Sequence, residues 1–297
     1  MARQAIEYLV GLVETGGPYP ADYGAVSESF SSIMNAARIG ALSSDDVRDM
    51  WQEMGEAFGS ETMQGHGIRK PYGYAGDFEM IDRIYQYSVC DNPVVRRWDE
   101  YFQSRKACEA VRNRKRYFID LMSGAIEGKQ TLRVLNVGSG PARDILEYYE
   151  MAQEDCVVSV DCVDMDEKAI NYATDLCSPF LNRITFHQAN IFKWRANGLY
   201  DFIWSAGLFD YLKDDAFKAL YRRLAVLLNP SGRLVVGNFS PENPTRDYME
   251  FGEWNLHHRS KVELIRLAES CEIPQAVLQV EEEPQGINLF LHLQRST

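Results

Sequence analysis

From Thr131 onward the chain alternates short apolar runs with helical stretches, and this alternation restricts the fold more than any other feature of the sequence. Apolar runs of strand length occur at residues 133–137, 157–163, 184–187, 202–205 and 233–237. Stretches with helical periodicity separate them, for example residues 167–177 and 216–228. Parallel strands need long crossover connections, which helices of this length provide. The pattern therefore predicts a doubly wound α/β fold, with helices on both faces of a mostly parallel sheet.

The C-terminal segment breaks this alternation. Two strand-like runs, residues 275–283 and 287–294, are separated only by a short turn that contains Pro284 and Gly286. Strands joined by so short a connection pair in antiparallel fashion. We therefore expect the parallel sheet to end in an antiparallel hairpin.

The residues before Thr131 carry apolar side chains three and four positions apart, as amphipathic helices do. The clearest such series consists of Ile6, Leu9, Val10 and Val13. Glycine and proline concentrate between residues 65 and 76, which predicts a loop. We therefore predict a helical N-terminal region over residues 1–128 and a sheet-containing domain over residues 129–297.

The first apolar run of the sheet domain leads into a glycine-rich turn. Gly138 and Gly140 allow the backbone to bend sharply and to approach a ligand without an intervening Cβ atom. A helix that begins just after this turn would direct free backbone amides toward an anionic or polar group. A tight strand-to-helix turn without any ligand would also explain the glycines, so their spacing alone is weak support for a site.

The second apolar run ends in a carboxylate, Asp164, which lies 24 positions after Gly140. In nucleotide-binding sheets an acid at this place, about 20 residues past the glycine turn, accepts hydrogen bonds from the two ribose hydroxyls. Capping the next helix is the alternative role for such an acid, and Asp166 is the better candidate for the cap. The glycine turn and Asp164 together predict a site for a nucleoside.

These residues resemble the class I S-adenosylmethionine-dependent methyltransferases, and the resemblance extends over residues 131–295. The family motif acid-x-Gly-x-Gly-x-Gly corresponds here to Asn136, Gly138, Gly140 and Ala142. The resemblance implies S-adenosylmethionine as the cofactor and a helical lid that helps to enclose the substrate. The cofactor-binding residues that it implies are Asn136, Gly138, Ser139, Gly140, Asp164, Met165, Asn190, Ile191 and Ser205.

Two positions depart from the family pattern. Asn136 replaces the acid that helps to hold the methionine amino group, and it offers a carbonyl acceptor without a charge. Ala142 replaces the third glycine. A second hypothesis follows from these departures, namely a binding or scaffolding protein that keeps the fold without catalysis. A nicotinamide-dependent dehydrogenase would share the turn and the acid, but it gives no reason for the closing hairpin.

The family reaction is an in-line displacement at the sulfonium methyl, so orientation and desolvation of the acceptor supply most of the catalysis. A general base is needed only where the acceptor has to lose a proton. Two segments outside the sheet pattern, residues 69–77 and 243–260, are rich in side chains suited to substrate contact. We predict Tyr74 and His257 as catalytic residues, and Tyr72, Arg246, Trp254 and Arg259 as substrate-binding residues.

Each of these side chains also has a structural alternative. The tyrosine-containing segment fits an ordinary loop, and His257 fits a surface or packing histidine. Arg246 and Arg259 have a substrate carboxylate as one candidate partner, and Glu250 or Glu253 as the other.

The same two segments, with Arg112 and Arg114 ahead of the first strand, resemble a bacterial subfamily that makes 3-hydroxy fatty acid methyl esters as extracellular signals. This resemblance implies methylation of an oxygen atom, with a methyl ester or ether as the product. It also implies that Arg112 or Arg114 reaches a carboxylate of the cofactor or the substrate. Methylation of a nitrogen atom in a small molecule is the alternative.

The composition restricts partners and compartment. The formal net charge is −12, from 43 acids and 31 bases, and such a surface repels nucleic acid and anionic membranes. We therefore expect a small-molecule acceptor, with a homodimer left open. No apolar run approaches the roughly 20 residues of a membrane span, and the N-terminus lacks the pattern of a secretion signal. Scattered cysteines and histidines predict no metal site and a cytoplasmic location.

Overall fold

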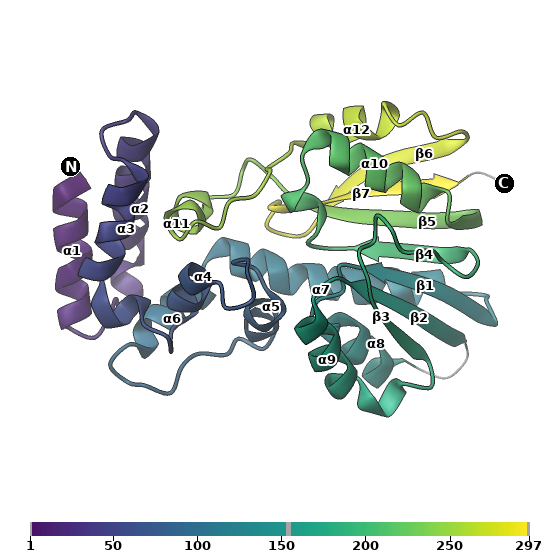
Figure 1. Ribbon diagram of the computed structural model, residues 1–297, viewed down its shortest axis with the longest axis horizontal. Helices are drawn as coiled ribbons and strands as arrows, with labels where there is room; N and C mark the ends of the chain where they lie inside the picture. The colour runs from purple at the N-terminus through teal and green to yellow at the C-terminus, as the bar shows by residue number, and fades with distance from the viewer. Residues whose placement is uncertain (1, 153–155, 296–297) are drawn as a thin grey trace. The chain divides into compact units, whose positions relative to one another are not determined.

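The computed structural model describes residues 2–152 and 156–295. They form two compact units (Figure 1). The helical unit comprises Met1–Glu109 and Asn243–Asn255, and the sheet unit comprises Ala110–Glu242 and Leu256–Thr297. The predicted division into residues 1–128 and 129–297 differs from these units in two segments. Residues 110–128 belong to the sheet unit, and residues 243–255 belong to the helical unit.

The long helix α7 (Lys106–Ala125) contains the first of these differences. Its apolar residues Phe118 and Met122 are fully buried in the core of the sheet unit. The ring of Phe118 lies 5.2 Å from that of Trp204. Most of the helix therefore belongs with the sheet, although its sequence pattern is that of the helices before it.

The second difference is the short helix α11 (Arg246–Phe251). Its Tyr248 and Phe251 rings pack against Phe30 of the helical unit, with centroid distances of 4.8 and 4.9 Å. This aromatic packing explains why a segment that follows a strand of the sheet joins the helical unit.

The sheet unit is built on seven strands in the order β3-β2-β1-β4-β5-β7-β6. Their bounds are β1 (Thr131–Val137), β2 (Val157–Asp164), β3 (Ile184–Gln188), β4 (Tyr200–Ser205), β5 (Leu228–Phe239), β6 (Ala276–Glu282) and β7 (Asn288–Arg295). β1 to β5 pair in parallel, whereas β7 is antiparallel to both β5 and β6. The predicted fold class, a mostly parallel sheet that ends in an antiparallel hairpin, is confirmed.

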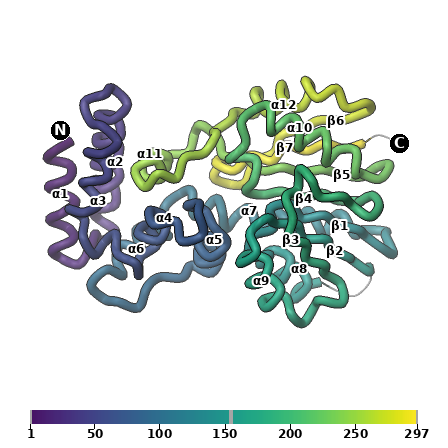
Figure 2. The backbone as a smooth tube through the Cα atoms, in the orientation of Figure 1, coloured from purple at the N-terminus to yellow at the C-terminus, as the bar shows by residue number. Residues whose placement is uncertain are grey.

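Helices cover both faces of this sheet, as Figures 1 and 2 show. α7, α8 (Arg143–Met151) and α9 (Glu167–Leu176) contribute to the core on one face. α10 (Asp214–Ala225) and α12 (Lys261–Glu269) contribute to the core on the other face. Two short 3-10 helices also occur among the described residues of this unit, η3 (Ser178–Phe180) and η4 (Phe209–Tyr211).

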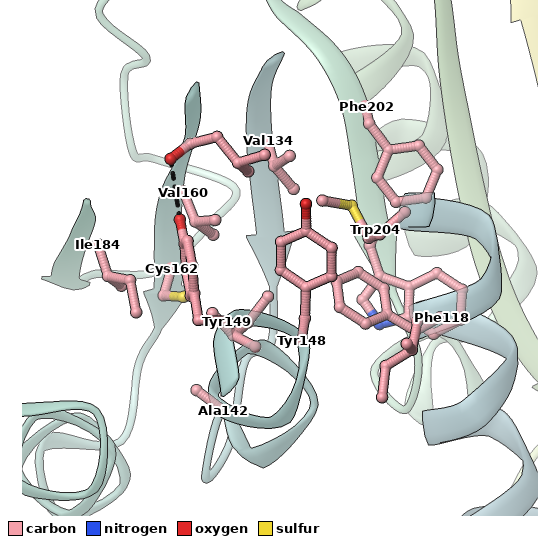
Figure 3. Close-up of a cluster of buried hydrophobic side chains, with 14 of the residues drawn as sticks. Phe118, Val134, Ala142, Tyr148, Tyr149, Val160, Cys162, Ile184, Phe202 and Trp204 are labelled. Carbon is pink, nitrogen blue, oxygen red and sulfur yellow. Dashed lines mark hydrogen bonds between the residues drawn. The ribbon is translucent and has the colours of Figure 1, made fainter. Parts of the chain in front are cut away.

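The core beneath α7 and α8 is drawn in Figure 3. Val134, Val160 and Phe202 come from three neighbouring strands and point to the same face, because side chains alternate along each strand. The hydroxyl of Tyr149 donates a hydrogen bond to the carbonyl oxygen of Val158 at 3.0 Å. This packing fixes β1, β2 and β4 in register, so their carboxyl ends meet at one edge of the sheet.

The helical unit contains α1 (Ala2–Glu14), η1 (Pro20–Asp22), α2 (Tyr23–Arg38), α3 (Ser44–Glu53), η2 (Gly55–Phe58), α4 (Met63–Arg69), α5 (Phe78–Tyr85) and α6 (Arg96–Gln103), together with α11. The predicted helical character of this region is confirmed. Ser43 caps α3, since its hydroxyl accepts a hydrogen bond from the amide of Asp46 at 3.1 Å. Among the described residues, none of the helices is both long enough and apolar enough to cross a membrane.

We expect alanine substitutions at two glycines to change the stability of the protein in opposite directions. A Cβ atom at Gly237, on β5, would lie 2.5 Å from the carbonyl oxygen of Ala206, so we expect Gly237→Ala to cost about 1–3 kcal/mol. Gly11 lies exposed in α1 with open space around its Cα, so Gly11→Ala should add up to about 1 kcal/mol. Urea unfolding followed by circular dichroism checks both values. An unchanged unfolding midpoint for Gly237→Ala would contradict the packing described for β5.

Candidate cofactor-binding site

The glycine turn after β1 has the geometry that the sequence predicts. Gly138 and Gly140 have φ angles of 63° and 51°, in the left-handed region that favours glycine. The amide of Gly138 donates a hydrogen bond to the carbonyl oxygen of Val163 at 2.8 Å, which holds the turn against the end of β2. A Cβ atom at Gly138 would also lie 3.1 Å from Cβ of Leu208, so the segment after β4 approaches the glycine turn closely.

Asp164 ends β2 directly beside this turn. One carboxylate oxygen accepts a hydrogen bond from the amide of Gly140 at 2.9 Å, and the other accepts one from the amide of Asp166 at 3.0 Å. Burial raises the pKa of Asp164, and the two amide hydrogen bonds oppose that rise. The structure thus brings together the two features on which the predicted nucleoside site depends. Each carboxylate oxygen also keeps a lone pair for a further donor.

Ala142, the first departure from the family motif, occupies the place of a third glycine. Its φ angle is 53°, so an alanine adopts the left-handed conformation that glycine normally supplies. The residue is fully buried and precedes α8 as its N-cap. Its methyl group belongs to the core cluster of Figure 3. Packing of this methyl group offsets part of the backbone strain, and the turn keeps its shape.

Asn136, the second departure, is buried near the end of β1. It is in register with Cys162 on β2 and with Trp204 on β4. Among the described residues, neither its Nδ2 atom nor the Oγ atom of buried Ser139 has a hydrogen-bond partner. A buried polar group without a partner costs about 1–3 kcal/mol. One of these groups lies near the end of β1 and the other in the turn after it. Together they are suited to a polar ligand, and they fit the methionine end of S-adenosylmethionine.

The remaining predicted cofactor residues follow β2, β3 and β4. Met165 is 71% exposed beside Asp164, and it offers an apolar surface at the site. The side-chain oxygen of Asn190 accepts a hydrogen bond from the amide of Phe192 at 2.9 Å, and Ile191 is buried next to it. The hydroxyl of Ser205 donates to the carbonyl oxygen of Val137 at 2.9 Å, so this side chain joins β4 to β1.

The loop after β3 is tied to the same edge of the sheet. The amide of Ala189 donates a hydrogen bond to the carbonyl oxygen of Asp164 at 2.8 Å. This bond places the segment that contains Asn190 and Ile191 next to the end of β2. The predicted ribose, adenine and methionine contacts therefore lie along one edge of one sheet.

Two buried carboxylates on this side of the molecule were missed by the sequence analysis. Asp144, in the first turn of α8, accepts hydrogen bonds from the amide of Ile145 at 3.0 Å and from Nε1 of Trp204 at 3.3 Å. Asp210, in η4, accepts one from the amide of Phe239 at 2.5 Å. An acid early in a helix or in a turn is usually exposed, so the sequence carried no signal of their burial.

Arg114 is the charged group that these two acids share. It is 5% exposed on α7, and a Cβ atom at Gly207 would lie 3.2 Å from its Nη1 atom. Burial raises the pKa of Asp144 to about 6 and that of Asp210 to about 7, and the positive charge of Arg114 opposes both shifts. The segment after β4 therefore passes over a buried arginine with two buried acids around it.

His257, predicted as a catalytic residue, and Arg259, predicted as a substrate-binding residue, have different surroundings in the sheet unit. His257 has an exposed side chain, and its backbone amide donates a hydrogen bond to the carbonyl oxygen of Asp210 at 2.7 Å. Arg259 is buried, and its guanidinium binds Asp214 at 2.8 Å and the side-chain oxygen of Asn238 at 2.8 Å. The carboxylate partner of Arg259 is therefore Asp214, neither Glu250 nor Glu253.

The other predicted substrate residues and Tyr74, the second predicted catalytic residue, lie in the helical unit. The hydroxyl of Tyr72 donates a hydrogen bond to Glu79 at 3.0 Å, and Tyr74 is half-buried in the same loop. Arg246 pairs with Glu250 at 2.5 Å, which is the structural alternative for this arginine. The amide of Trp254 donates to the carbonyl oxygen of Met249 at 2.8 Å.

An ion pair joins the two segments predicted to contact the substrate. Nζ of Lys70 lies 3.2 Å from the carboxylate of Glu253, which also binds Arg48 at 2.9 Å. Lys70 begins the loop between α4 and α5 that contains Tyr72 and Tyr74 (residues 70–77), called the tyrosine loop below. Glu253 lies in the segment after β5. The helical unit therefore holds both segments together, a relation that 183 residues of separation conceal in the sequence.

Comparison with known proteins agrees with the fold of the sheet unit. Residues 134–232 match the methyltransferase domain family, and no curated protein matches the chain. The chain is similar in structure to a possible exported protein from Bordetella parapertussis, with 16% identity, a TM-score of 0.63 and coverage of 100% of this chain and 97% of that one. It is also similar to magnesium protoporphyrin IX methyltransferase from Synechocystis, with 14% identity, a TM-score of 0.50 and coverage of 64% and 88%.

The matched family segment begins in β1, contains the glycine turn and Asp164, and ends within β5. The sheet unit therefore has the fold of these methyltransferase structures and contains the segment that matches the methyltransferase domain family. The likeness to the Bordetella protein extends over the helical unit as well, and at this level of identity it concerns the fold alone.

The buried Asp210 predicts a pH dependence of stability. Its pKa of about 7 in the folded protein exceeds the value of 3.8 in an unstructured chain, so the folded state binds a proton that the unfolded state has released. Stability therefore falls as pH rises from about 4 to about 7, and the loss is complete above that range. Asp210→Asn cannot ionise and keeps an acceptor for the amide of Phe239. Between pH 5 and pH 7, the free energy of unfolding of Asp210→Asn should therefore rise relative to that of the wild type by roughly 1.4 kcal/mol per pH unit.

Urea unfolding of both proteins at several pH values measures this difference. Asp175→Asn, which removes an exposed carboxylate from α9, controls for the loss of one negative charge. The prediction would be contradicted if the free energies of unfolding of Asp210→Asn and the wild type differed by a constant amount across the pH range.

Proposed function

We propose that this protein transfers the methyl group of S-adenosylmethionine to an oxygen atom of a small-molecule acceptor. The observation that carries the proposal is the hydrogen bond from the Gly140 amide to Asp164. It joins a left-handed glycine turn to an acid at the end of the neighbouring parallel strand, which is the arrangement that a nucleoside cofactor requires.

The residues around this bond define how the cofactor would be held. Asp164 would accept hydrogen bonds from the ribose hydroxyls through its remaining lone pairs. The unpartnered polar atoms of Asn136 and Ser139 would bind the methionine end. Met165 and Ile191 would flank the adenine, and Asn190 would contribute the polar contact to its exocyclic amine.

The bound cofactor supplies an activated methyl group on a positively charged sulfur. The protein then has to orient the acceptor and exclude water, with the reacting atoms about 3–3.5 Å apart. A carboxylate acceptor needs no base, whereas a hydroxyl acceptor has to lose its proton. We assign Tyr72 and Trp254 to acceptor binding, and Tyr74 and His257 as candidate catalytic residues.

A small molecule is a better acceptor for this chain than a nucleic acid. The formal charge of −12 opposes the approach of a polyanion. The resemblance of the segments at residues 69–77 and 243–260 to the fatty acid methyl ester subfamily supports oxygen over nitrogen. The cytoplasmic location and the homodimer stay predictions from the sequence.

A binding protein without catalysis is the second candidate function, and the absence of an acid at position 136 favours it. In this case the chain would bind the cofactor tightly and transfer no methyl group. Asn136 keeps a carbonyl acceptor at this place, and buried Asp144 is hydrogen-bonded to Trp204, the register partner of Asn136. A carboxylate is therefore retained on the same face of the sheet, which supports the catalytic proposal.

The proposed cofactor site is tested by isothermal titration with S-adenosylmethionine and with S-adenosylhomocysteine. Asp164→Ala should weaken binding by about 1–3 kcal/mol, because the ribose hydroxyls lose their acceptor. Asp175→Ala, an equivalent change on the exposed face of α9, should leave the affinity unchanged. Absence of binding by the wild type at millimolar ligand, or equal affinities for the two variants, would refute this site.

The proposed reaction is tested by incubating the protein with methyl-labelled S-adenosylmethionine and an extract of the cells that naturally produce it. We expect the label in a low-molecular-weight product, and Asp164→Ala should slow its formation at limiting cofactor. Label in protein or nucleic acid would contradict a small-molecule acceptor. Tight cofactor binding with no label in any fraction would support the non-catalytic alternative.

A further inference from the structure

Asp144 is a buried carboxylate in the first turn of α8, five positions after Ser139 of the glycine turn. Its Oδ1 atom accepts a hydrogen bond from the amide of Ile145 at 3.0 Å, and its Oδ2 atom accepts one from Nε1 of Trp204 at 3.3 Å. Each of these bonds uses one lone pair, so each oxygen can accept a further hydrogen bond. A buried carboxylate is stable where donors or a positive charge compensate for its lost hydration. Two neutral donors therefore satisfy Asp144 only in part.

The indole of Trp204 connects this carboxylate to the end of β1. Trp204 on β4 is the register partner of Asn136 on β1, and it belongs to the core that α7 and α8 cover. Val134, two positions before Asn136 on the same strand, belongs to that core as well. Because side chains alternate along a strand, Asn136 points to the same face of the sheet as Val134. Asp144 and Asn136 thus lie on one face, where β1 ends.

The unpartnered atoms at this place include donors as well as acceptors. Within the described part of the chain, neither the Nδ2 atom of Asn136 nor the Oγ atom of Ser139 has a hydrogen-bond partner. The Nδ2 atom only donates, a hydroxyl donates or accepts, and a carboxylate only accepts. A ligand group that satisfies all three side chains has to present donors and acceptors side by side. An α-amino acid group does so, because its ammonium donates and its carboxylate accepts.

Arg114 supplies a positive charge near Asp144. Its side chain is buried under the segment after β4, since a Cβ atom at Gly207 would lie 3.2 Å from the Nη1 atom. Burial raises the pKa of Asp144 to about 6, and the charge of Arg114 opposes this rise. An acid and an arginine at one site complement the two opposite charges of an amino acid group.

A carboxylate at position 144 also explains why residue 136 is neutral. Two buried acids on one face of the sheet repel each other, and one of them would take up a proton. The acid of the family motif and Asp144 would therefore compete for the same cation. Asn136 retains the donor and the acceptor of an amide at this place, while Asp144 provides the charge.

Two other acids at this edge of the sheet have different neighbours. Asp210 accepts its hydrogen bond from a backbone amide at the end of β5, and β4 separates β5 from β1. Asp164 ends β2 and accepts a hydrogen bond from the glycine turn, which is the place of the proposed ribose contact. Of the three carboxylates, Asp144 is the one bonded to the register partner of Asn136.

We propose that Asp144 binds the ammonium group at the methionine end of S-adenosylmethionine and takes the place of the acid that the family motif has at position 136. The inference rests on the proposed function. The donors for the carboxylate of the same amino acid group are Arg114, Asn136 and Ser139. Asp164 then recognises the cofactor through its ribose, and Asp144 recognises it through its ammonium group. A nucleoside without an amino acid group makes the first contact but not the second.

Two ligands separate the two ends of the cofactor in a binding experiment. S-adenosylhomocysteine contains the amino acid group, whereas 5′-methylthioadenosine has the same nucleoside and a sulfur atom without it. Isothermal titration of the full chain measures both affinities. In Asp144→Asn the affinity for S-adenosylhomocysteine should fall by about 10–100-fold, because the ammonium group loses a charged hydrogen-bond partner. The affinity for 5′-methylthioadenosine should stay unchanged, which also shows that the variant is folded.

Two control variants complete this experiment. Asp175→Asn removes an exposed carboxylate from α9 and should change neither affinity. Asp164→Ala should weaken the binding of both ligands, because both contain the ribose. An unchanged affinity of Asp144→Asn for S-adenosylhomocysteine would overturn the proposal. An equal loss of affinity for the two ligands would also overturn it, since a purely structural residue gives that result.

Failure of the proposed function gives a different result, because the wild type would then bind neither ligand. An exchange of two residues tests the replacement of the motif acid. The double variant Asn136→Asp with Asp144→Asn should regain most of the S-adenosylhomocysteine affinity that Asp144→Asn loses. Equal affinities of the double variant and Asp144→Asn would contradict the exchange of roles.

A crystal structure of the complex with S-adenosylhomocysteine checks the contact directly. The ammonium nitrogen should lie within about 3.2 Å of a carboxylate oxygen of Asp144. An ammonium group bound to other acceptors, with Asp144 beyond hydrogen-bond distance, would overturn the assignment without any measurement of activity.

Discussion

The hydrogen bond between the Gly140 amide and the Asp164 carboxylate is the interaction on which the rest of the site depends. It forms because β1 and β2 are parallel neighbours, so the turn after one strand and the acid that ends the other reach the same edge of the sheet. The left-handed backbone at Gly138 and Gly140 directs the amide toward the acid. Without this geometry, the unpartnered atoms of Asn136 and Ser139 would only destabilise the fold.

Much of this sheet could be predicted from the sequence, because its pattern follows from strand burial and crossover length. Apart from the hairpin, the order of the strands could not be predicted from the sequence, and neither could the unit to which α7 belongs. Helical periodicity shows that one face of a helix is buried but not what buries it, so Phe118 resembles the core residues of the earlier helices. Tyr248 and Phe251 show the same limit, since aromatic residues after a strand give no sign that they pack against Phe30.

The cofactor residues were more predictable than the charged residues around them. Glycines with positive φ and an acid at a strand end are local features, each determined by a few neighbouring positions. Burial of Asp144 and Asp210, and the use of Arg259 within the protein, depend on partners 21 to 60 positions away in the sequence, namely Trp204, Phe239 and Asn238. Spacing rules cannot supply such partners, and a charge is exposed unless the fold provides them.

The same reasoning explains why the family match does not determine the acceptor. The matched segment, residues 134–232, contains the glycine turn and Asp164 but neither the tyrosine loop nor the segment that includes Trp254. The family match therefore covers the proposed cofactor residues, whereas the proposed acceptor contacts lie in segments that it does not include.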